Sequence, residues 1–267
     1  MKTMGSDPSH RNRKSKLYGV NPVLEALRAR QRTIEEISIA SGAREGRLHE
    51  LIELARAQNV PVSRASRAAL DRAAGNTHHQ GVVARVAAAR YADAEQMLNS
   101  VAERVGGKTE PLVVVLDGVE DPRNLGAILR TAECAGVDGV FVPERRAAGL
   151  VDTVSKAAAG AVEHVPVARA TNLARLIEQL KERNVWVVGT AADASVIYTE
   201  WDWTRASAVV LGGEGSGLRR LVRERCDALV SIPVQGRISA LNVSVAAGVI
   251  LYEAVRQRMM ARAAAKV

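Results

Sequence analysis

The feature that most constrains the fold is a regular alternation of short apolar runs and helical patterns after residue 110. The first run, Leu112–Leu116, is continuously apolar and suits a strand that is buried on both faces of a parallel sheet. Further strands are predicted at residues 139–142, 164–167, 185–189, 208–212 and 229–232. Helices are predicted near residues 125–135, 151–158, 173–183 and 218–224, with a long final helix over residues 242–262. This alternation predicts an α/β fold with a doubly wound, mostly parallel sheet.

A smaller α/β domain is predicted before this sheet. Its strands are expected at residues 34–40, 60–62 and 81–87, and its helices near residues 48–59 and 67–73, with a first helix capped by Asn21 and opened by Pro22. We therefore expect four parts: a disordered basic arm (1–16), the small domain (17–90), a linker (91–110) and the large domain (111–267).

The positive charge lies in the first third of the chain. Residues 1–90 contain 16 Lys and Arg against 8 Asp and Glu, whereas the rest contains 21 of each, so this third accounts for the net charge of +8. A basic domain beside a neutral one favours a part that binds a polyanion joined to a part with another task. A positive surface that only aids solubility remains the alternative.

Composition excludes several other classes of protein. Aromatic residues make up 3% of the chain, which disfavours RNA readers that stack bases on Phe, Trp or Tyr. No apolar run approaches the roughly 20 residues of a membrane span, and the start lacks a secretion signal, so we expect a cytoplasmic protein. Two cysteines, Cys134 and Cys226, are expected to be reduced and buried, and five scattered histidines give no metal site. The pair His78-His79 is expected in a loop that faces RNA.

Three loops rich in Gly, Asn or Ser follow predicted strands, where ligands bind in open α/β sheets. The first runs from Asp117 to Arg130, where Asn124 either caps a helix or serves a site, and Arg130, six positions later, is expected on a similar face. The second is the glycine-rich segment 211–218, which fits neither the dinucleotide nor the P-loop spacing. The third, residues 231–246, holds Ser239 and Asn242, and either residue alone would also suit a helix cap.

Taken together, the three loops resemble a known family. The segments NLGAILR, LGGEGSGL and SIPVQGRISALNVSVAAGVILYE resemble, in order and spacing, the three motifs of the SpoU (TrmH) class of ribose methyltransferases in the SPOUT superfamily. LYGVNPVLEAL (17–27) and HQGVVA (79–84) resemble the branch that methylates a guanosine of large-subunit rRNA. The resemblance implies a C-terminal trefoil knot, an N-terminal RNA-binding domain like ribosomal protein L30e, and 2′-O-methylation of a ribose, with a guanosine in 23S rRNA expected as the substrate.

The resemblance also implies roles for particular residues. S-adenosyl-L-methionine would be the cofactor, in a pocket formed by Gly212, Ile232 and Leu241 with Thr190 and Gly213 nearby. Arg130 matches the motif arginine that is proposed to assist deprotonation of the 2′-hydroxyl. Because a guanidinium stays protonated, we expect it instead to clamp phosphate and stabilise the developing alkoxide. The remaining motif residues would orient Arg130 and the ribose: Asn124, Glu214, Ser239 and Asn242. No metal is implied.

The final helix carries a broad apolar stripe: Val243, Ala246, Ala247, Ile250, Leu251, Ala254 and Val255. One side is expected to pack on the sheet and another to meet a second copy. The resemblance implies a homodimer formed through the knotted domain, with the active site near the interface. A single buried helix in a monomer is the alternative.

Three other functions stay open at this point. A tRNA ribose methyltransferase would share the motifs, as would an antibiotic-resistance rRNA methyltransferase of related fold. A noncatalytic RNA-binding factor for ribosome assembly would explain the basic domain, but it leaves the motif polar residues without a purpose.

Overall fold

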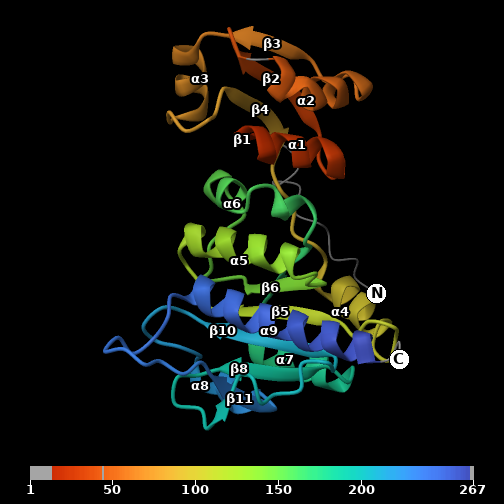
Figure 1. The fold of residues 1–267 in the computed structure, drawn as a ribbon, viewed down its shortest axis with the longest axis vertical. Helices are drawn as coiled ribbons and strands as arrows, with labels where there is room; N and C mark the ends of the chain where they lie inside the picture. The colour runs from red at the N-terminus through yellow and green to blue at the C-terminus, as the bar shows by residue number, and fades with distance from the viewer. Residues whose placement is uncertain (1–13, 44, 265–267) are drawn as a thin grey trace, which may run out of the picture. The chain divides into compact units, whose positions relative to one another are not determined.

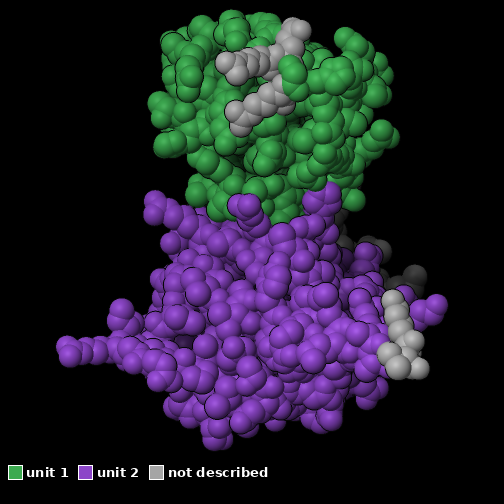
Figure 2. Space-filling view, in the orientation of Figure 1, with its two compact units in different colours: residues 1–90, 150–163 green, residues 91–149, 164–267 purple. Residues whose placement is uncertain are grey.

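The computed structural model describes residues 14–43 and 45–264, and the chain divides into two compact units (Figures 1 and 2). Unit 1 comprises Met1–Arg90 and Leu150–Glu163, and unit 2 comprises Tyr91–Gly149 and His164–Val267. Most of the expected basic arm lies outside the described residues. Its last three residues, 14–16, belong to the first strand of unit 1, β1 (Lys14–Tyr18).

Unit 1 is built on a four-stranded sheet in the order β1-β4-β2-β3. The remaining strands are β2 (Ile34–Ala40), β3 (Val62–Ala65) and β4 (Val82–Ala87). Strand β4 runs antiparallel to both β1 and β2, whereas β3 runs parallel to β2. The helices of unit 1 are α1 (Val20–Ala29), α2 (Glu45–Ala57), α3 (Arg67–Ala74) and α6 (Asp152–Ala157), with a short 3₁₀ turn, η2 (Ala161–Glu163). Apolar residues of the sheet, α1 and α2 form one buried core.

Helix α1 begins earlier than the sequence predicts. Its N-cap is Gly19, whose φ of 103° lies in a region that favours glycine, and Val20 donates its N–H to the Gln80 side chain at 3.3 Å. The prediction that Asn21 caps this helix is therefore wrong.

A segment from the second half of the sequence completes unit 1. The guanidinium of Arg32 pairs with the Glu163 carboxylate, and both side chains are about 5% exposed or less. Asp152 accepts hydrogen bonds from the Ser15 hydroxyl and, at 3.3 Å, from the Lys16 backbone N–H. Residues 150–163 thus supply charged partners to the small domain, a contribution that short-range sequence patterns do not reveal.

His79 is part of the unit 1 interior. Its side chain is fully buried, Nε2 lies 2.9 Å from the Asp71 carboxylate, and Nδ1 accepts the Gly81 N–H at 2.9 Å. Only His78 of the histidine pair is exposed, so the expectation of two RNA-facing histidines is wrong for His79.

Unit 2 contains a seven-stranded sheet in the order β7-β6-β5-β10-β8-β11-β9, and every neighbouring pair in it is parallel. The strands are β5 (Leu112–Asp117), β6 (Gly139–Pro143), β7 (Val167–Ala170), β8 (Trp186–Thr190), β9 (Val196–Ile197), β10 (Ser207–Gly212) and β11 (Ala228–Ser231). The helices are α4 (Ala94–Ala102), α5 (Pro122–Cys134), α7 (Leu173–Glu182), α8 (Arg220–Arg225) and α9 (Val243–Ala264). This is the α/β architecture that the alternating pattern predicts.

Helices cover both faces of this sheet. Buried residues of α4, α7 and α8 form one core cluster with alternate residues of the strands, such as Val113 and Val115. The intervening residues, such as Val114, point to the opposite face, where α5 packs against α9 and α9 crosses the sheet at β10 (Figure 1). The trefoil knot stays a prediction.

Helix α4 and strands β3 and β7 also differ from the sequence prediction. Residues 91–110 were expected to form a linker, yet they contain α4, whose Met97, Leu98 and Val101 are buried in the unit 2 core. Strands β3 and β7 begin after Pro61 and Pro166 rather than before them. Proline lacks an N–H for the ladder, so it precedes a strand more readily than it joins one.

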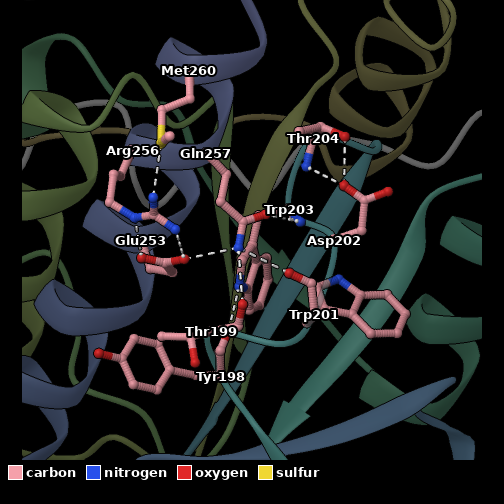
Figure 3. Close-up of polar contacts among 10 residues, drawn as sticks. All are labelled: Tyr198, Thr199, Trp201, Asp202, Trp203, Thr204, Glu253, Arg256, Gln257 and Met260. Carbon is pink, nitrogen blue, oxygen red and sulfur yellow. Dashed lines mark hydrogen bonds and ion pairs between the residues drawn. The ribbon is translucent and has the colours of Figure 1, made fainter.

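The second half of α9 is anchored to the loop that precedes β10 (Figure 3). Gln257 accepts the Trp203 N–H at 2.9 Å and donates to the Trp201 carbonyl at 3.0 Å. Arg258 donates to the carbonyls of Glu110 and Trp203 at 2.7 and 2.9 Å. These bonds fix the C-terminal half of the helix on the amino-end side of the sheet.

Both thiols of the chain are free, but they differ in environment. Cys134 is exposed on α5, so the expectation that it is buried is wrong. Burial, aided by the nearby Asp227 charge, raises the pKa of the Cys226 thiol to about 12. Within residues 14–43 and 45–264, no helix has the length and hydropathy to cross a membrane, and no three His, Cys, Asp or Glu side chains gather as metal ligands.

Candidate active site

The three glycine- and asparagine-rich loops meet at the carboxyl edge of the unit 2 sheet. One follows β5, one follows β10, and one follows β11 and leads into α9. Their backbones and side chains touch at several points, which places residues more than 100 positions apart in one site. Ligand sites of open α/β sheets lie at this edge.

Asn124 lies inside helix α5 rather than at its end. The helix begins at Pro122, and the Asp121 carboxylate caps it by accepting the Arg123 N–H at 2.8 Å. Asn124 is 9% exposed and donates its side-chain amide to Glu214 at 2.5 Å. The capping role that the sequence allowed for Asn124 is therefore excluded, and its amide serves a contact between two loops.

Asn242 completes a triangle of polar side chains. Its Nδ2 lies 3.1 Å from the Asn124 Oδ1 and 3.0 Å from the Glu214 Oε1. Its Oδ1 accepts the Ser244 N–H at 2.9 Å at the start of α9. Asn242 therefore combines the two roles that the sequence allowed. Its Oδ1 stabilises the start of α9, and its Nδ2 reaches Asn124 and Glu214. One Glu214 oxygen receives two amide donors, which holds this carboxylate in place.

A second polar contact joins the same loops. Asp117 ends β5 and is fully buried, and its carboxylate accepts the Arg219 backbone N–H at 2.8 Å and the Arg219 Nε at 2.5 Å. This pair was not predicted from the sequence. The available signal was the position of Asp117 directly after the continuously apolar run of residues 112–116, at the end of a buried strand where a charge needs a partner.

The glycines of the second loop are required by contacts with protein. A Cβ on Gly212 would lie 2.2 Å from the Gly217 carbonyl carbon, and a Cβ on Gly213 would lie 2.3 Å from the Gly118 carbonyl oxygen. The Gly217 N–H donates to the Gly213 carbonyl at 3.1 Å, which closes the loop on itself. From the resemblance, Gly212 was expected to form the cofactor pocket and Gly213 to lie near it. The structure adds that the loops themselves need the space.

A cavity of about 460 Å³ lies beside this cluster, a size that suits a small-molecule ligand. Thr190 ends β8, Gly212 ends β10 and is followed by Gly213, and Ile232 follows β11. All five residues expected to contact a cofactor line the cavity: Thr190, Gly212, Gly213, Ile232 and Leu241. Glu214 and Ser239 line it as well, while no hydrogen bond of the Ser239 side chain to the described part of the chain is seen.

An ion pair stands at the wall of the same cavity. Arg223 donates from Nη1 and Nη2 to the two carboxylate oxygens of Asp193, both at 2.9 Å. These hydrogen bonds lower the pKa of Asp193 and raise that of Arg223. Neither residue was selected from the sequence, because the loop after β8 carries no recognisable motif.

Arg130 does not join the cluster. Six helical positions rotate a side chain by about 600°, so Arg130 and Asn124 point about 120° apart around α5 rather than to a similar face. Arg130 is exposed, and it makes no hydrogen bond or ion pair with residues 14–43 and 45–264. Its neighbour Thr131 faces α9, where the Thr131 Cγ2 lies 3.9 Å from the position of a Cβ on Gly248.

The chain matches two family models. The SpoU rRNA Methylase family matches residues 111–252, and the family for RNA 2′-O ribose methyltransferase substrate binding matches residues 16–92. The 23S rRNA (guanosine-2′-O-)-methyltransferase RlmB of Pseudomonas putida is 46% identical over 247 residues, which cover 92% of this chain and 98% of that protein. RlmB of Escherichia coli is 43% identical over 242 residues, covering 91% of this chain and 98% of that protein.

A solved structure extends the likeness. The SpoU methyltransferase AviRb from Streptomyces viridochromogenes, in complex with the cofactor AdoMet, superposes with a TM-score of 0.73 at 25% identity and covers 92% of this chain and 91% of that chain. The matched models cover both the small domain and the sheet that carries the site. The chain therefore belongs to the SpoU rRNA methylase family.

Proposed function

We propose that this protein transfers a methyl group from S-adenosyl-L-methionine to the 2′-hydroxyl of a guanosine in 23S rRNA. The observation that carries the proposal is the cluster of Asn124, Glu214 and Asn242 beside the glycine-walled cavity. The names of the RlmB relatives, which match more than nine-tenths of the chain, support rRNA and guanosine. A noncatalytic RNA-binding factor would have no use for such a cluster.

The cavity suits S-adenosyl-L-methionine. Its wall offers apolar side chains for the adenosyl part, among them Ile232 and Leu241, and backbone groups of Gly212 and Gly213 for polar contacts. Asp193 supplies a carboxylate at the wall that suits an amine or a ribose hydroxyl. When bound, the cofactor supplies an electrophilic methyl group on its sulfonium sulfur.

The residues of the chain would act mainly by positioning the ribose and by stabilising charge. Glu214, held by two amides, would orient the ribose hydroxyls, and Ser239 lies on the cavity wall where it would donate a further hydrogen bond. Arg130 would stabilise the negative charge that develops on the 2′-oxygen. A guanidinium is a poor base, so the proton leaves to water or to a phosphate rather than to Arg130.

We infer that the protein works as a homodimer. Val245, Tyr252 and Met259 follow each other at intervals of seven on α9 and are 51%, 52% and 63% exposed, so they form an apolar stripe on one side of the helix. Arg130 lies on α5, which packs against α9, and it is exposed without a hydrogen bond or ion pair to the described residues. A second copy on this face would cover the stripe and bring an active site toward Arg130.

Unit 1 would bind the RNA. Arg67 and Arg72 of α3 are exposed, as is Arg64 on edge strand β3, and the family model for substrate binding spans residues 16–92. Arginine side chains of this kind bind phosphates and make affinity fall with salt.

The direct test is methyl transfer in vitro. The purified protein is incubated with labelled S-adenosyl-L-methionine and a 23S rRNA transcript, and the RNA is then digested to nucleosides. The proposal expects label in 2′-O-methylguanosine. Label on a base, label in tRNA but not in rRNA, or RNA binding without transfer would each reject it.

A further inference from the structure

A second cavity lies on the carboxyl edge of the unit 2 sheet, outside the site described above. Its volume is about 710 Å³, and it opens beyond the ends of β6 and β7. Four arginines line it: Arg145 and Arg146 after β6, and Arg219 and Arg220 at the start of α8. Glu144 is the one acidic residue among those that line it.

Two of these arginines carry uncompensated charge. Arg219 pairs with Asp117, and Arg220 donates to Glu224 at 2.9 Å. Arg145 and Arg146 are exposed and make no ion pair or hydrogen bond within the part of the chain that the structure describes. The cavity therefore presents guanidinium groups that are free to bind an anion.

The backbone at Arg146 and the start of α7 also shape this cavity. Arg146 has a φ of 58°, in the left-handed region that non-glycine residues rarely adopt. The ten-residue helix α7 begins on the opposite wall, capped by Asn172, and its first amides add to the positive potential.

The two cavities are neighbours. The sheet order places β5 alone between β6 and β10, so the nearest strands of the two sites are about two strand spacings, ~10 Å, apart. The loop that carries Glu214 and Gly217 lines the first cavity and runs directly into Arg219 and Arg220, which line the second. An extended strand of nucleic acid with one ribose at Glu214 would reach the arginines with its neighbouring phosphates.

We propose that this arginine cavity binds backbone phosphates of the RNA strand next to the ribose that is methylated, an inference that rests on the proposed function. No aromatic side chain lines the cavity, so it offers phosphates a charge but offers bases nothing to stack on. Two unpaired arginines, with Arg219 and Arg220 beside them, also exceed what a single inorganic phosphate needs. Unit 1 supplies one RNA contact, and the catalytic unit supplies this second one.

The test compares the double variant Arg145→Ala/Arg146→Ala with the wild type. It measures the affinity for a 23S rRNA transcript at several salt concentrations, the KM and kcat of methyl transfer, and the affinity for S-adenosylhomocysteine. Loss of two phosphate contacts lowers the slope of log affinity against log salt by about 1.4 for single-stranded RNA. We expect KM for RNA to rise about tenfold, with affinity for S-adenosylhomocysteine unchanged.

The matched control is Arg205→Ala/Arg262→Ala, which removes the same charge at the opposite edge of unit 2. Arg205 pairs with Asp202 before β10, and Arg262 contacts Thr109 before β5. The variant Arg145→Lys/Arg146→Lys keeps the charge and should keep most of the salt slope. The inference is wrong if the alanine pair behaves like the control, or if it loses inorganic phosphate binding without any change in RNA affinity.

The binding measurement also separates this inference from the proposed function. If the wild type binds RNA but transfers no methyl group, the proposed function fails while the salt slopes still decide the phosphate site. If transfer is normal and the slopes of wild type and alanine variant agree, only the phosphate site is rejected. Circular dichroism of each variant excludes a loss of fold as the cause.

Discussion

At the scale of single residues, Glu214 is the centre of the proposed site because one of its oxygens receives the amides of Asn124 and Asn242. Replacing it by alanine removes the group that would orient the ribose. It also leaves the Asn124 amide without its acceptor and the Asn242 amide with the Asn124 oxygen alone. We expect Glu214→Ala to lower kcat by about 10²–10³, as loss of a preorganised polar group does. Calorimetry with S-adenosylhomocysteine should give an unchanged affinity. The control is Glu103→Ala, at the exposed C-cap of α4, which should keep full turnover.

Replacement of Arg130 should also lower turnover, but for a different reason. Arg130→Ala removes a cation aimed at the charge that develops on the 2′-oxygen, so turnover should fall while cofactor affinity holds. Arg130→Lys should restore little, because an ammonium does not reproduce the planar guanidinium. Unchanged turnover in Arg130→Ala would remove this residue from the mechanism, and lost cofactor affinity would move it to the cofactor site.

Gly213 tests the packing of the loops. A methyl group at this position would meet the Gly118 carbonyl at 2.3 Å, so Gly213→Ala should push the two loops apart. We expect a loss of about 1–3 kcal/mol in the free energy of unfolding, as for other overpacked sites, together with weaker binding of S-adenosylhomocysteine. Gly236→Ala is the control, since a Cβ there has no atom within 4 Å. Equal stability of both variants would contradict the steric argument.

At the scale of elements, the exposed stripe on α9 predicts the dimer. Tyr252→Glu places a charge in the middle of the stripe, and we expect light scattering to give the mass of one chain where the wild type gives two. Methyl transfer should fall with the dimer. Val151→Glu, another exposed apolar position but in unit 1, should leave the mass unchanged. A wild type that is monomeric at micromolar concentration would contradict the interface.

The elements themselves were largely predictable from sequence. Strands were predicted at residues 112–116 and 208–212 because continuous apolar runs of that length suit buried strands, and the structure has β5 and β10 there. Helix α4 was not predicted, because its few buried residues lie in a polar segment with glycines after it. The prolines at 61 and 166 shifted two strand starts, a local effect that apolar alternation alone does not show.

The site was predictable in part. The resemblance of the motifs predicted five residues near the cofactor, and all five line one cavity. Asp193 and Arg223 were missed because their pairing joins two segments 30 positions apart with no motif in either. The face of Arg130 was misjudged, since six residues do not complete whole turns of a helix.

At the scale of the whole molecule, unit 1 depends on a segment distant in sequence. Arg32 and Glu163 form a buried ion pair, so Arg32→Ala would leave the Glu163 carboxylate buried without a partner. We expect this variant to lose about 3–5 kcal/mol in the free energy of unfolding, measured with denaturant. Arg32→Met/Glu163→Met should recover most of that loss. If the single and double variants are equally stable, the pair does not hold residues 150–163 to the small domain.

The two units divide the proposed task. Unit 1 carries exposed arginines and the family's substrate-binding region, while unit 2 carries the cavity and the three loops. Sequence alone separated these roles through the charge of residues 1–90. It did not assign residues 150–163 to unit 1, because that contact is made between segments more than 100 positions apart.

The most direct test of the central claim is a map of ribose methylation in the rRNA of a strain that lacks the gene. We predict that one 2′-O-methylguanosine of 23S rRNA disappears, returns with a plasmid copy of the wild type, and does not return with Glu214→Ala. An unchanged methylation pattern in the deletion strain, or a loss confined to tRNA, would contradict the claim.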